Sequence, residues 1–356
     1  MGNAMARPPK KVTIRDVARL AGTSTSTVSI AISGQGRISE TTRRHVIDAA
    51  DRLGWRPDRR ASGLRQFNPR VVGIVYDAEQ PFQARLLDCA YVAMRKQGIE
   101  VIVAAATPHH DEQACVAELR RNGCQALVTT GADLTDSEIA QVARRMPTMS
   151  LGREVHIGGV DTVACDSHRG SEMAVEFLVG LGHGDIVHVD GGGVPMTDMR
   201  TSGYAAAMAR HGLAGRVRVI HGGVTLDAGI GAARALLAGE SLPTGVTCFN
   251  DLCAAGLVRE LRLLGVRVPE QVSVVGFDDA PTAADPTTAL TTVGQDMDAL
   301  ADRAAKQLSL RIADGVPMRP GAEKVDIIEP SIVIRTTTAA PRSFALSPVR
   351  VPPTTG

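Results

Sequence analysis

Aromatic residues, closely spaced cysteines and long apolar runs are scarce or missing in this sequence. Phe, Tyr and Trp make up 3% of the residues, so few rings are available to stack on a ligand. The six cysteines include no CxxC pair, so we expect small buried apolar side chains rather than a zinc site or a disulfide framework. No apolar run approaches the length of a membrane span, and the N-terminus lacks the apolar centre of a signal peptide. We therefore expect a cytoplasmic protein that does not enter a membrane.

Net charge is also nearly absent, at +1, but it is unevenly distributed along the chain. Residues 1–70 carry +9, and residues 71–356 carry −8. A basic head on an acidic body suits a protein that approaches phosphate with one end only. A solvated basic tail is the alternative, but the arginines of the head fall on regular helical faces. The charge pattern therefore favours a head that binds nucleic acid.

A helix-turn-helix pattern lies within this basic head. The apolar positions of its first helix recur at helical spacing at Ile14, Val17, Ala18 and Ala21. Gly22 would end this helix, and the hydroxyl of Ser24 would cap a second helix that presents Val28 and Ile32 on one face. In such a motif the N-terminal side chains of the second helix enter the major groove of DNA. The residues placed to meet base edges are Thr25, Ser26 and Ser29, none of which is bulky.

A third helix and one further short segment are expected next. Ser39 can cap the third helix, and Gly54 can end it. Its inward positions would be Val46, Ile47, Ala50 and Leu53. Residues 58–66, which follow Pro57, could form a helix that is too short to be stable alone in water. The sequence therefore predicts three stable helices and a segment that folds only on DNA.

The runs VTIRDVARLAGTSTSTVS, from Val12, and ISETTRRHVIDAADRLGWRPD, from Ile38, resemble the DNA-binding headpiece of the lactose repressor (LacI/GalR) family of bacterial transcription factors. The resemblance covers nearly the whole headpiece without a gap and continues at lower density to about residue 338. A bare helix-turn-helix would be weak evidence, because helical corners in other proteins produce the same pattern. The DNA-binding positions that we infer are Thr13, Ser24, Thr25, Ser26, Thr27, Ser29, Ile30, Arg37, Arg59 and Leu64.

Two of these positions have consequences for operator recognition. In the family, the segment at 58–68 pairs with its dimer mate in the minor groove, where a Leu wedges into the central base step, and Leu64 matches that position. Ordinary linker packing is the alternative for Leu64. Ile30 stands where the family most often has an Arg. Because Arg bonded to guanine is the commonest specific base contact and Ile offers only apolar contact, we expect an operator half-site that differs from the usual one.

From residue 71 onward, short apolar runs alternate with longer amphipathic stretches, as in parallel sheets flanked by helices. The expected strands are 71–76, 100–106, 126–130, 147–151, 185–190, 217–222, 245–250 and 272–278, with final strands near 325–335. The expected helices are 82–97, 112–122, 136–145, 167–181, 199–211, 227–238, 251–264 and 296–312. So many units favour two α/β lobes over one sheet, with the break near Asp166 and Ser167.

The resemblance implies that this body is similar to a periplasmic sugar-binding protein, with a ligand held between two lobes. The implied parts are a headpiece 1–57, a hinge 58–68, a first lobe 69–166 plus 294–325, a second lobe 167–293 plus 326–339, and a disordered tail 340–356 rich in Pro, Ser and Thr. The tail shows no apolar heptad of a tetramer-forming coil. A homodimer is therefore expected.

Polar side chains follow several of the expected strands, and in open α/β sheets ligands bind beyond the carboxyl ends of the strands. The Arg, Asn and Asp that hydrogen-bond ligands in the family match Arg200, Asn250 and Asp278. Positions that line the family's pocket match Phe82, Gln83 and Arg153. Helix capping or a structural ion pair is the alternative for the charged and amide residues, above all for Arg153. This set suits a polar ligand with several donors and acceptors.

A sugar or sugar derivative is the first hypothesis for this ligand, although one departure weakens it. Sugar-binding relatives commonly stack an aromatic ring on the pyranose from the loop after HGG, and here that loop reads Gly223-Val224-Thr225. Phe82 is the main ring left for the ligand.

No catalytic constellation stands out. The Gly191–Gly193 run lacks the Walker Lys and the full GxGxxG spacing, the His109–Glu112 run fits solvated or capping residues better than a metal site, and no nucleophile elbow occurs. We therefore predict a dimeric regulator, most simply a repressor, that binds pseudo-palindromic operator DNA under the control of a small polar effector. No enzyme activity, cofactor, metal or membrane partner is expected. The alternative is a solute-binding protein or α/β enzyme with an incidental helical head.

Overall fold

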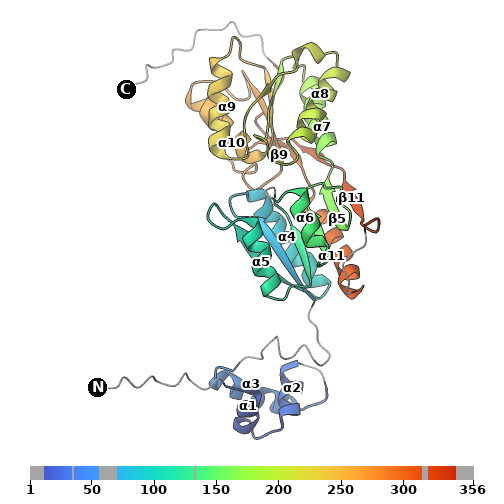
Figure 1. Ribbon diagram of the computed structural model, residues 1–356. Coiled ribbons are helices and arrows are strands. Elements are labelled where there is room, and N and C mark those ends of the chain that lie inside the picture. Colours follow the sequence, from blue (N-terminus) through green and yellow to red (C-terminus); the bar gives the residue numbers. More distant parts are fainter. Residues whose placement is uncertain (1–11, 34–35, 56–69, 132–133, 315–319, 342–356) are drawn as a thin grey trace, which may run out of the picture. The chain divides into compact units, whose positions relative to one another are not determined.

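A computed structural model describes residues 12–33, 36–55, 70–131, 134–314 and 320–341 of the chain. The chain divides into two compact units, Met1–Asn68 and Pro69–Gly356 (Figure 1). The expected hinge, with Arg59 and Leu64, lies outside the described residues, as does all of the expected tail beyond Pro341.

The N-terminal unit contains the three helices that the sequence predicts: α1 (Ile14–Leu20), α2 (Thr25–Ser33) and α3 (Glu40–Arg52). They share one apolar core, formed by Val17, Ala18, Ala21, Val28, Ala31, Val46, Ala49 and Ala50. Ser24 accepts a hydrogen bond from the backbone N–H of Thr27 at 3.1 Å, and Ser39 accepts one from Thr42 at 3.1 Å. Both expected caps are therefore confirmed.

The end of α3 is also built as expected, but one inward position is wrong. Gly54 has a φ of +61°, in the left-handed region that favours glycine, and the N–H of Trp55 reaches back to the carbonyl of Ala50 at 2.9 Å. Ile47, however, is 39% exposed, because the buried stripe of the helix follows Val46 and Ala49 at helical spacing and Ile47 lies outside it.

The first lobe of the larger unit is a parallel sheet covered on both faces. Its strands are β1 (Arg70–Asp77), β2 (Ile99–Ala106), β3 (Ala126–Thr129), β4 (Thr148–Leu151), β5 (Val160–Cys165) and β11 (Val325–Ile328). Their order across the sheet is β11-β5-β4-β3-β1-β2, with every pairing parallel. The central strands are buried along their whole length, which explains their continuous apolar sequence.

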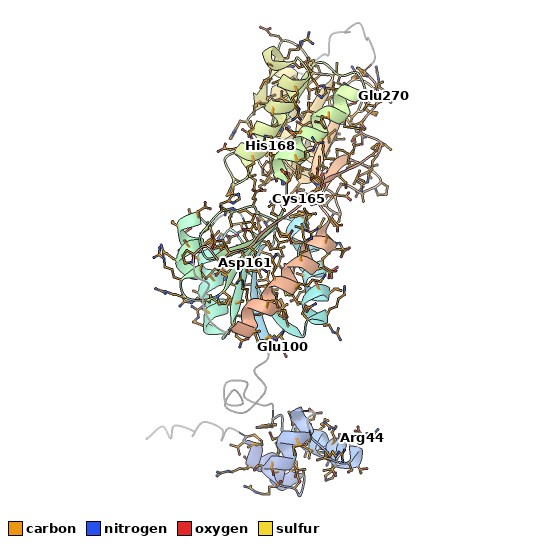
Figure 2. All side chains as sticks on the ribbon, turned by 90° about the vertical axis from the view of Figure 1, so that its right-hand side faces the viewer. Arg44, Glu100, Asp161, Cys165, His168 and Glu270 are labelled. Atoms are coloured by element: carbon orange, nitrogen blue, oxygen red, sulfur yellow. The ribbon has the colours of Figure 1, made fainter. Side chains whose placement is uncertain are left out.

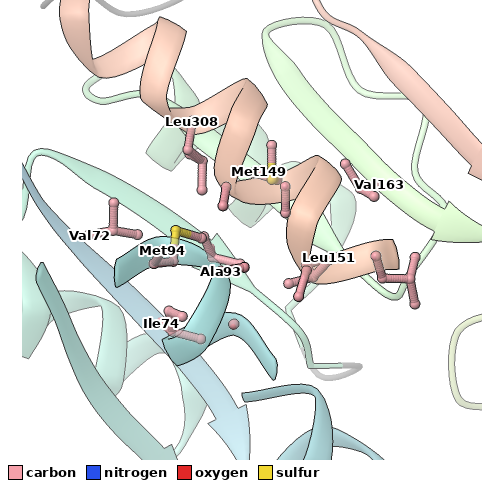
Figure 3. Close-up of a cluster of buried hydrophobic side chains, with 14 of the residues drawn as sticks. Val72, Ile74, Ala93, Met94, Met149, Leu151, Val163 and Leu308 are labelled. Carbon is pink, nitrogen blue, oxygen red and sulfur yellow. The ribbon is translucent and has the colours of Figure 1, made fainter. Parts of the chain in front are cut away.

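Helices pack on both faces of this sheet. On one face, α4 (Pro81–Lys96) and α11 (Met297–Asp314) lie against each other and against the strands, burying Met94 and Leu308 with Val72 and Met149 (Figure 3). On the other face, α5 (Glu112–Arg121) and α6 (Asp136–Ala143) bury a second cluster. The core of the first lobe is therefore split by the sheet into two apolar layers.

The second lobe repeats this architecture. Its strands are β6 (Ile186–Val189), β7 (Val219–Ile220), β8 (Gly245–Cys248), β9 (Ser273–Asp278), β10 (Thr291–Gly294) and β12 (Ser331–Val333), in the order β12-β10-β9-β8-β6-β7. Only the pairing of β12 with β10 is antiparallel among the described strands of this sheet. The covering helices are α7 (Ser167–Gly180) with α8 (Thr197–Arg210), and α9 (Leu226–Ala238) with α10 (Asp251–Leu263).

The chain passes between the lobes three times in the described part. It passes after Cys165, the last residue of β5, into α7, which contains His168 (Figure 2), again between β10 and α11, and finally between β11 and β12. The expected boundary at residues 325 and 326 is wrong. Val325–Ile328 pairs with β5 in the first sheet, so the last passage lies between Ile328 and Ser331. Only two residues separate β11 from β12, although these strands belong to different sheets. The sequence therefore did not show at which residue the chain changes lobes.

The fold class expected from the sequence is confirmed, and most predicted elements agree with the structure within two or three residues. Two strands, β5 (Val160–Cys165) and β10 (Thr291–Gly294), are not among those expected from the sequence. Five of the six cysteines are buried, and none forms a disulfide in the structure. None of the described helices is long and apolar enough to cross a membrane.

Candidate functional site

Hydroxyl groups gather at the exposed N-terminal end of α2. The Oγ of Ser24 lies 2.7 Å from the Oγ of Ser26 and 2.9 Å from the Oγ1 of Thr27. Thr25 and Ser29 are exposed on the same helix, whereas Thr27 is half-buried. This end of α2 thus offers small donors and acceptors, which can approach the edges of bases in a major groove.

The remaining expected DNA contacts differ in their surroundings. Thr13 is exposed and caps α1, with its N–H and hydroxyl donating to Asp16 at 3.0 and 2.7 Å. Arg37 is exposed. Ile30 is half-buried and packs over Gly36, where an added Cβ would lie 3.0 Å from its Cγ2. Ile30 therefore has a packing partner within the headpiece besides any contact with a base.

Arg43 is a headpiece residue whose structural role the sequence pattern did not predict. Its Nη1 donates to the carbonyl of Ala31 at 3.0 Å, near the C-terminal end of α2. A cation suits this end of a helix, where backbone carbonyls carry partial negative charge. Arg43 thereby fixes α2 against α3 from the end opposite to the hydroxyl cluster.

In the second lobe, a buried arginine lies between two aromatic rings. The guanidinium of Arg200, on α8, lies 4.4 Å from the ring centroid of Phe249 and 3.7 Å from that of Phe277. Its Nη1 donates to the carbonyl of Phe249, and its Nη2 lies 3.5 Å from the Oδ1 of Asp278. Arg200 is 5% exposed, so ring faces and a carboxylate replace water around its charge.

Asp278 ends β9 beside this arginine. Its Oδ1 accepts a hydrogen bond from the Nε2 of Gln295 at 2.8 Å. Burial raises the pKa of Asp278 to about 6, although the charge of Arg200 and the hydrogen bonds from Gln295 and Arg200 act to lower it. Burial also lowers the pKa of Arg200, against the effect of Asp278. The two charges thus depend on each other for their place in the interior.

The loop after β9 has an unusual backbone that other charged groups hold in place. Asp278 and Asp279 have φ angles of +118° and +52°, which non-glycine residues rarely adopt. The N–H of Ala280 donates to the buried carboxylate of Asp251 at 2.8 Å, and Arg335 bonds to Asp279 at 2.6 Å. These contacts on both sides of the loop fix the direction of the Asp278 side chain.

Asn250 caps α10 and also reaches the other lobe. Its Oδ1 accepts from the N–H of Cys253 at 2.9 Å. Its Nδ2 donates to the carbonyl of Val224 at 3.1 Å and lies 3.4 Å from the Oε1 of Gln80, which belongs to the first lobe. The capping alternative is therefore observed, and the amide nitrogen of the same side chain lies between the lobes.

The three candidate residues of the first lobe are arranged differently. Gln83 is buried, and its amide oxygen accepts from the N–H of Asp77 at 2.7 Å and from the hydroxyl of Thr130 at 2.8 Å. Phe82 is half-buried, beside Gly152. The guanidinium of Arg153 donates to the carbonyl of Leu134 and to Asp136, both at 2.7 Å. Arg153 thus makes a structural ion pair, which is the alternative to a ligand contact.

The structure adds Gln295, Phe249 and Phe277 to the candidate site. Gln295 directly follows β10, where ligand-binding residues of open α/β sheets are expected. It was not predicted because β10 was not predicted. Two buried side-chain atoms of the cluster, the Nε of Arg200 and the Oε1 of Gln295, lack a hydrogen-bond partner. Because buried polar groups are normally paired, an unpaired donor and an unpaired acceptor on two side chains that both contact Asp278 favour a bound polar molecule here.

The described residues contain no group of His, Cys, Asp and Glu side chains that could hold a metal ion. The arrangement around Arg200 and Asp278 provides fixed donors and acceptors for recognition of a polar molecule. A helix-turn-helix unit joined in one chain to a two-lobed body of parallel sheets defines the class of protein: a DNA-binding regulator with a periplasmic-binding-protein-like body.

Comparison with known families and curated proteins agrees with this class. The family described as "Bacterial regulatory proteins, lacI family" matches residues 13–58, and the "Periplasmic binding protein-like domain" matches residues 175–338. The regulator GalR of Escherichia coli K12 is 31% identical over 92% of this chain and 96% of its own length. The repressor PurR of Vibrio campbellii is 31% identical over 91% of this chain and 98% of its own length. The chain belongs to the LacI/GalR family of bacterial transcriptional regulators, whose members bind DNA and are not enzymes.

Solved structures show the same fold. A LacI-type regulator from Rhodococcus is 34% identical, with a TM-score of 0.72 over 76% of this chain and 99% of that one. A LacI-family regulator from Enterococcus faecium, solved with bound ribose, is 25% identical, with a TM-score of 0.67 over 76% and 100%. The lac repressor dimer bound to operator and an anti-inducer is 24% identical, with a TM-score of 0.75 over 93% and 100%.

Proposed function

We propose that this regulator is a repressor whose affinity for operator DNA is controlled by a small polar effector bound between the two lobes. The observation that carries the proposal is the buried group formed by Arg200, Asp278 and Gln295, which holds an unpaired donor and an unpaired acceptor. Asn250 belongs to the same site, since it extends from the second lobe toward Gln80 of the first. Phe82 and the amide nitrogen of Gln83 complete the site on the first lobe. Arg153 stabilises the first lobe near this site by its ion pair with Asp136, the first residue of α6.

Control of DNA binding requires that the effector bind one arrangement of the lobes better than another. A ligand held by Asn250 and Asp278 on one lobe and by Phe82 on the other would favour the arrangement in which all three contacts are made. The first lobe begins directly after the segment that joins it to the headpiece, at Arg70. A change between the lobes would thus reach the hinge, where we propose Leu64 as the minor-groove wedge and Arg59 as a further DNA-binding residue.

A sugar or sugar derivative is the effector class that we propose first. Fixed donors and acceptors around Arg200 and Asp278 suit a ligand with several hydroxyl groups. The ribose-bound relative from Enterococcus faecium shows that this fold holds a sugar in another member of the family. Val224 stands in the loop where sugar-binding relatives carry a ring, so stacking would rest on Phe82 alone. We therefore expect a small sugar, which needs little stacking, to bind more tightly than a large apolar glycoside.

A thermal-shift screen of sugars, polyols and nucleobases would test the effector site. A ligand at 100 times its Kd stabilises the folded state by about 2.7 kcal/mol, which is ample for detection. We expect the stabilising compound to lose its effect on the Asp278→Asn variant, because that change removes the carboxylate that faces Arg200. A compound that stabilises the wild type and the variant equally would place the effector elsewhere, and one from the nucleobase group would replace the sugar hypothesis.

We propose that the chain acts as a homodimer on a pseudo-palindromic operator. Two exposed apolar side chains adjoin on α4, Tyr91 at 42% and Val92 at 54% exposure, and such a face is suited to a second copy. The lac repressor, which has this fold, was solved as an operator-bound dimer. The two headpieces would then present Thr25, Ser26 and Ser29 to half-sites related by two-fold symmetry.

Ile30→Arg is expected to change the preferred half-site. An Arg at this position can donate two hydrogen bonds to guanine, whereas Ile can contact only an apolar group such as a thymine methyl, and a bidentate pair discriminates between bases by about 1–3 kcal/mol. Selection of binding sites from a random duplex library by both proteins would show a gain of guanine at one position of each half-site. Identical selected sites would show that Ile30 only packs against Gly36.

A further inference from the structure

Three consecutive helices of the first lobe end in pairs of basic residues. Arg95 and Lys96 end α4, Arg120 and Arg121 end α5, and Arg144 and Arg145 directly follow α6. All six side chains are exposed. We refer to these six residues as the basic edge.

The topology of the sheet brings the basic edge to one end of the lobe. β2 begins at Ile99, β3 at Ala126 and β4 at Thr148, each only a few residues after one of these pairs. These strands are parallel, and each begins within two residues of the start of its neighbour: Ile99 lies opposite Arg70, Ala126 opposite Val72 and Thr148 opposite Leu127. Glu100, near the start of β2, marks this end of the lobe in Figure 2, whereas Cys165 ends β5 at the other. The basic edge therefore lies at the amino ends of the strands, opposite the proposed effector site.

The helix dipole alone does not account for these pairs. Cations are favoured at the C-terminal end of any helix, so the effect would act equally in both lobes. In the second lobe, however, α7 and α9 have no basic residue in the last turn. Arg210 of α8 pairs there with Glu172 and Glu176, and Arg262 of α10 donates to a backbone carbonyl. Exposed basic pairs at successive helix ends are thus particular to the lobe that adjoins the headpiece in sequence.

Three of these six charges, on Arg120, Arg144 and Arg145, are not neutralised by an ion pair among the described residues. Lys96 lies 3.5 Å from Asp302, and Glu100 is an exposed acidic residue near the edge. The body as a whole carries a net charge of −8 over residues 71–356, which would repel a phosphate backbone. The three arginines without an ion pair, Arg120, Arg144 and Arg145, reverse this repulsion locally at one end of the lobe.

The position of the basic edge in the chain determines what it can meet. β1 begins at Arg70 on the same edge, and residues 56–69 join it to the headpiece. A segment of that length spans at most about 50 Å, so DNA held by the headpiece stays within reach of this lobe. We propose that the basic edge contacts the phosphate backbone of the duplex flanking the operator half-sites. These contacts add affinity that depends on salt and not on base sequence.

The test compares Arg120→Gln/Arg144→Gln/Arg145→Gln, in the full chain, with wild type on two duplexes. Both carry a site selected by the wild-type protein from a random library, one with little flanking sequence and one extended on each side by about two helical turns. We expect the variant to bind the extended duplex about 10-fold more weakly at 0.1 M salt, and its slope of log Kd against log salt to fall by about 1 to 3. On the short duplex the two proteins should bind alike, which shows that the headpiece is intact.

A second triple variant with the same loss of charge serves as the control. Arg216→Gln/Arg259→Gln/Arg267→Gln removes three exposed arginines from the second lobe, away from the basic edge. It should match wild type on both duplexes. The proposal is overturned if the basic-edge variant keeps the wild-type salt slope on the extended duplex, or if both triple variants lose affinity equally. A loss on both duplexes with an unchanged slope also overturns it, since this indicates an indirect effect on the headpiece.

Discussion

Arg200→Met is expected to lower the free energy of unfolding by about 3–5 kcal/mol at neutral pH, because it leaves the buried carboxylate of Asp278 without its cation. The penalty should shrink as the pH falls. Burial already raises the pKa of Asp278 to about 6, and loss of Arg200 removes an influence that lowers it. The folded variant therefore binds a proton at a pH where the unfolded chain, with an ordinary Asp pKa, does not, so protonation stabilises the folded state as the pH decreases below the raised pKa. Calorimetry between pH 7.5 and 5 would measure both effects.

The double variant Arg200→Met/Asp278→Asn separates the ion pair from general damage to the core. Replacing both charges by neutral groups of similar shape removes the unpaired charge, so most of the stability should return. Binding of the effector should not return, because the donors and the carboxylate are gone. If the double variant is as unstable as Arg200→Met, the cost arises from the lost contact of the guanidinium with Phe249 and Phe277 and not from Asp278.

Gly229→Ala should destabilise the second lobe by about 3 kcal/mol, because it forces two packed helices apart. A Cβ at Gly229 of α9 would lie 1.9 Å from the carbonyl oxygen of Cys253 and 2.8 Å from the backbone N of Leu257, both on α10. These are backbone atoms, so no side chain can turn away to make room. For a lobe of this size the melting temperature should fall by roughly 6–12 °C. Scanning calorimetry of the full chain would detect this shift.

Gly231→Ala, two residues along the same helix, is the matched control. A Cβ at Gly231 meets nothing within 4 Å, and alanine is a better helix former than glycine by about 0.8–1.0 kcal/mol. This variant should therefore melt at a slightly higher temperature than wild type. Equal losses in both variants would mean that α9 needs glycine for its backbone conformation and not for close approach to α10.

The headpiece could be predicted almost completely, because its determinants are local. Ser24 and Ser39 cap helices through hydrogen bonds that span three residues, and Gly54 supplies a left-handed turn that sequence alone indicates. The exception is Ile47, which was expected to face inward but lies just outside the buried face of its helix. The alternation of strands and helices in the body could also be predicted from short segments, because strands that are buried on both faces have continuously apolar sequences.

The candidate effector site could be predicted only in part. Arg200, Asn250 and Asp278 were found because they match family positions and because two of them follow strands. Gln295 was missed with its strand, and the rings of Phe249 and Phe277 gave no sign in the sequence that they would enclose a guanidinium. Arg153 has the residue type of a ligand contact, yet its nitrogens bind Leu134 and Asp136. Residue type does not specify which of several possible partners a long side chain reaches.

The sequence by itself determined the three headpiece helices, the two α/β lobes and the separation of a basic head from an acidic body, because hydrophobic period, capping residues and charge act within a few residues along the chain. Tertiary structure decided which sheet takes each of the two final strands, and it brought Arg200 of α8 to Asp278 of β9. It also aligned three helix ends into the basic edge. These outcomes depend on contacts between residues far apart in the chain, whose energies arise from burial and pairing that no local pattern encodes.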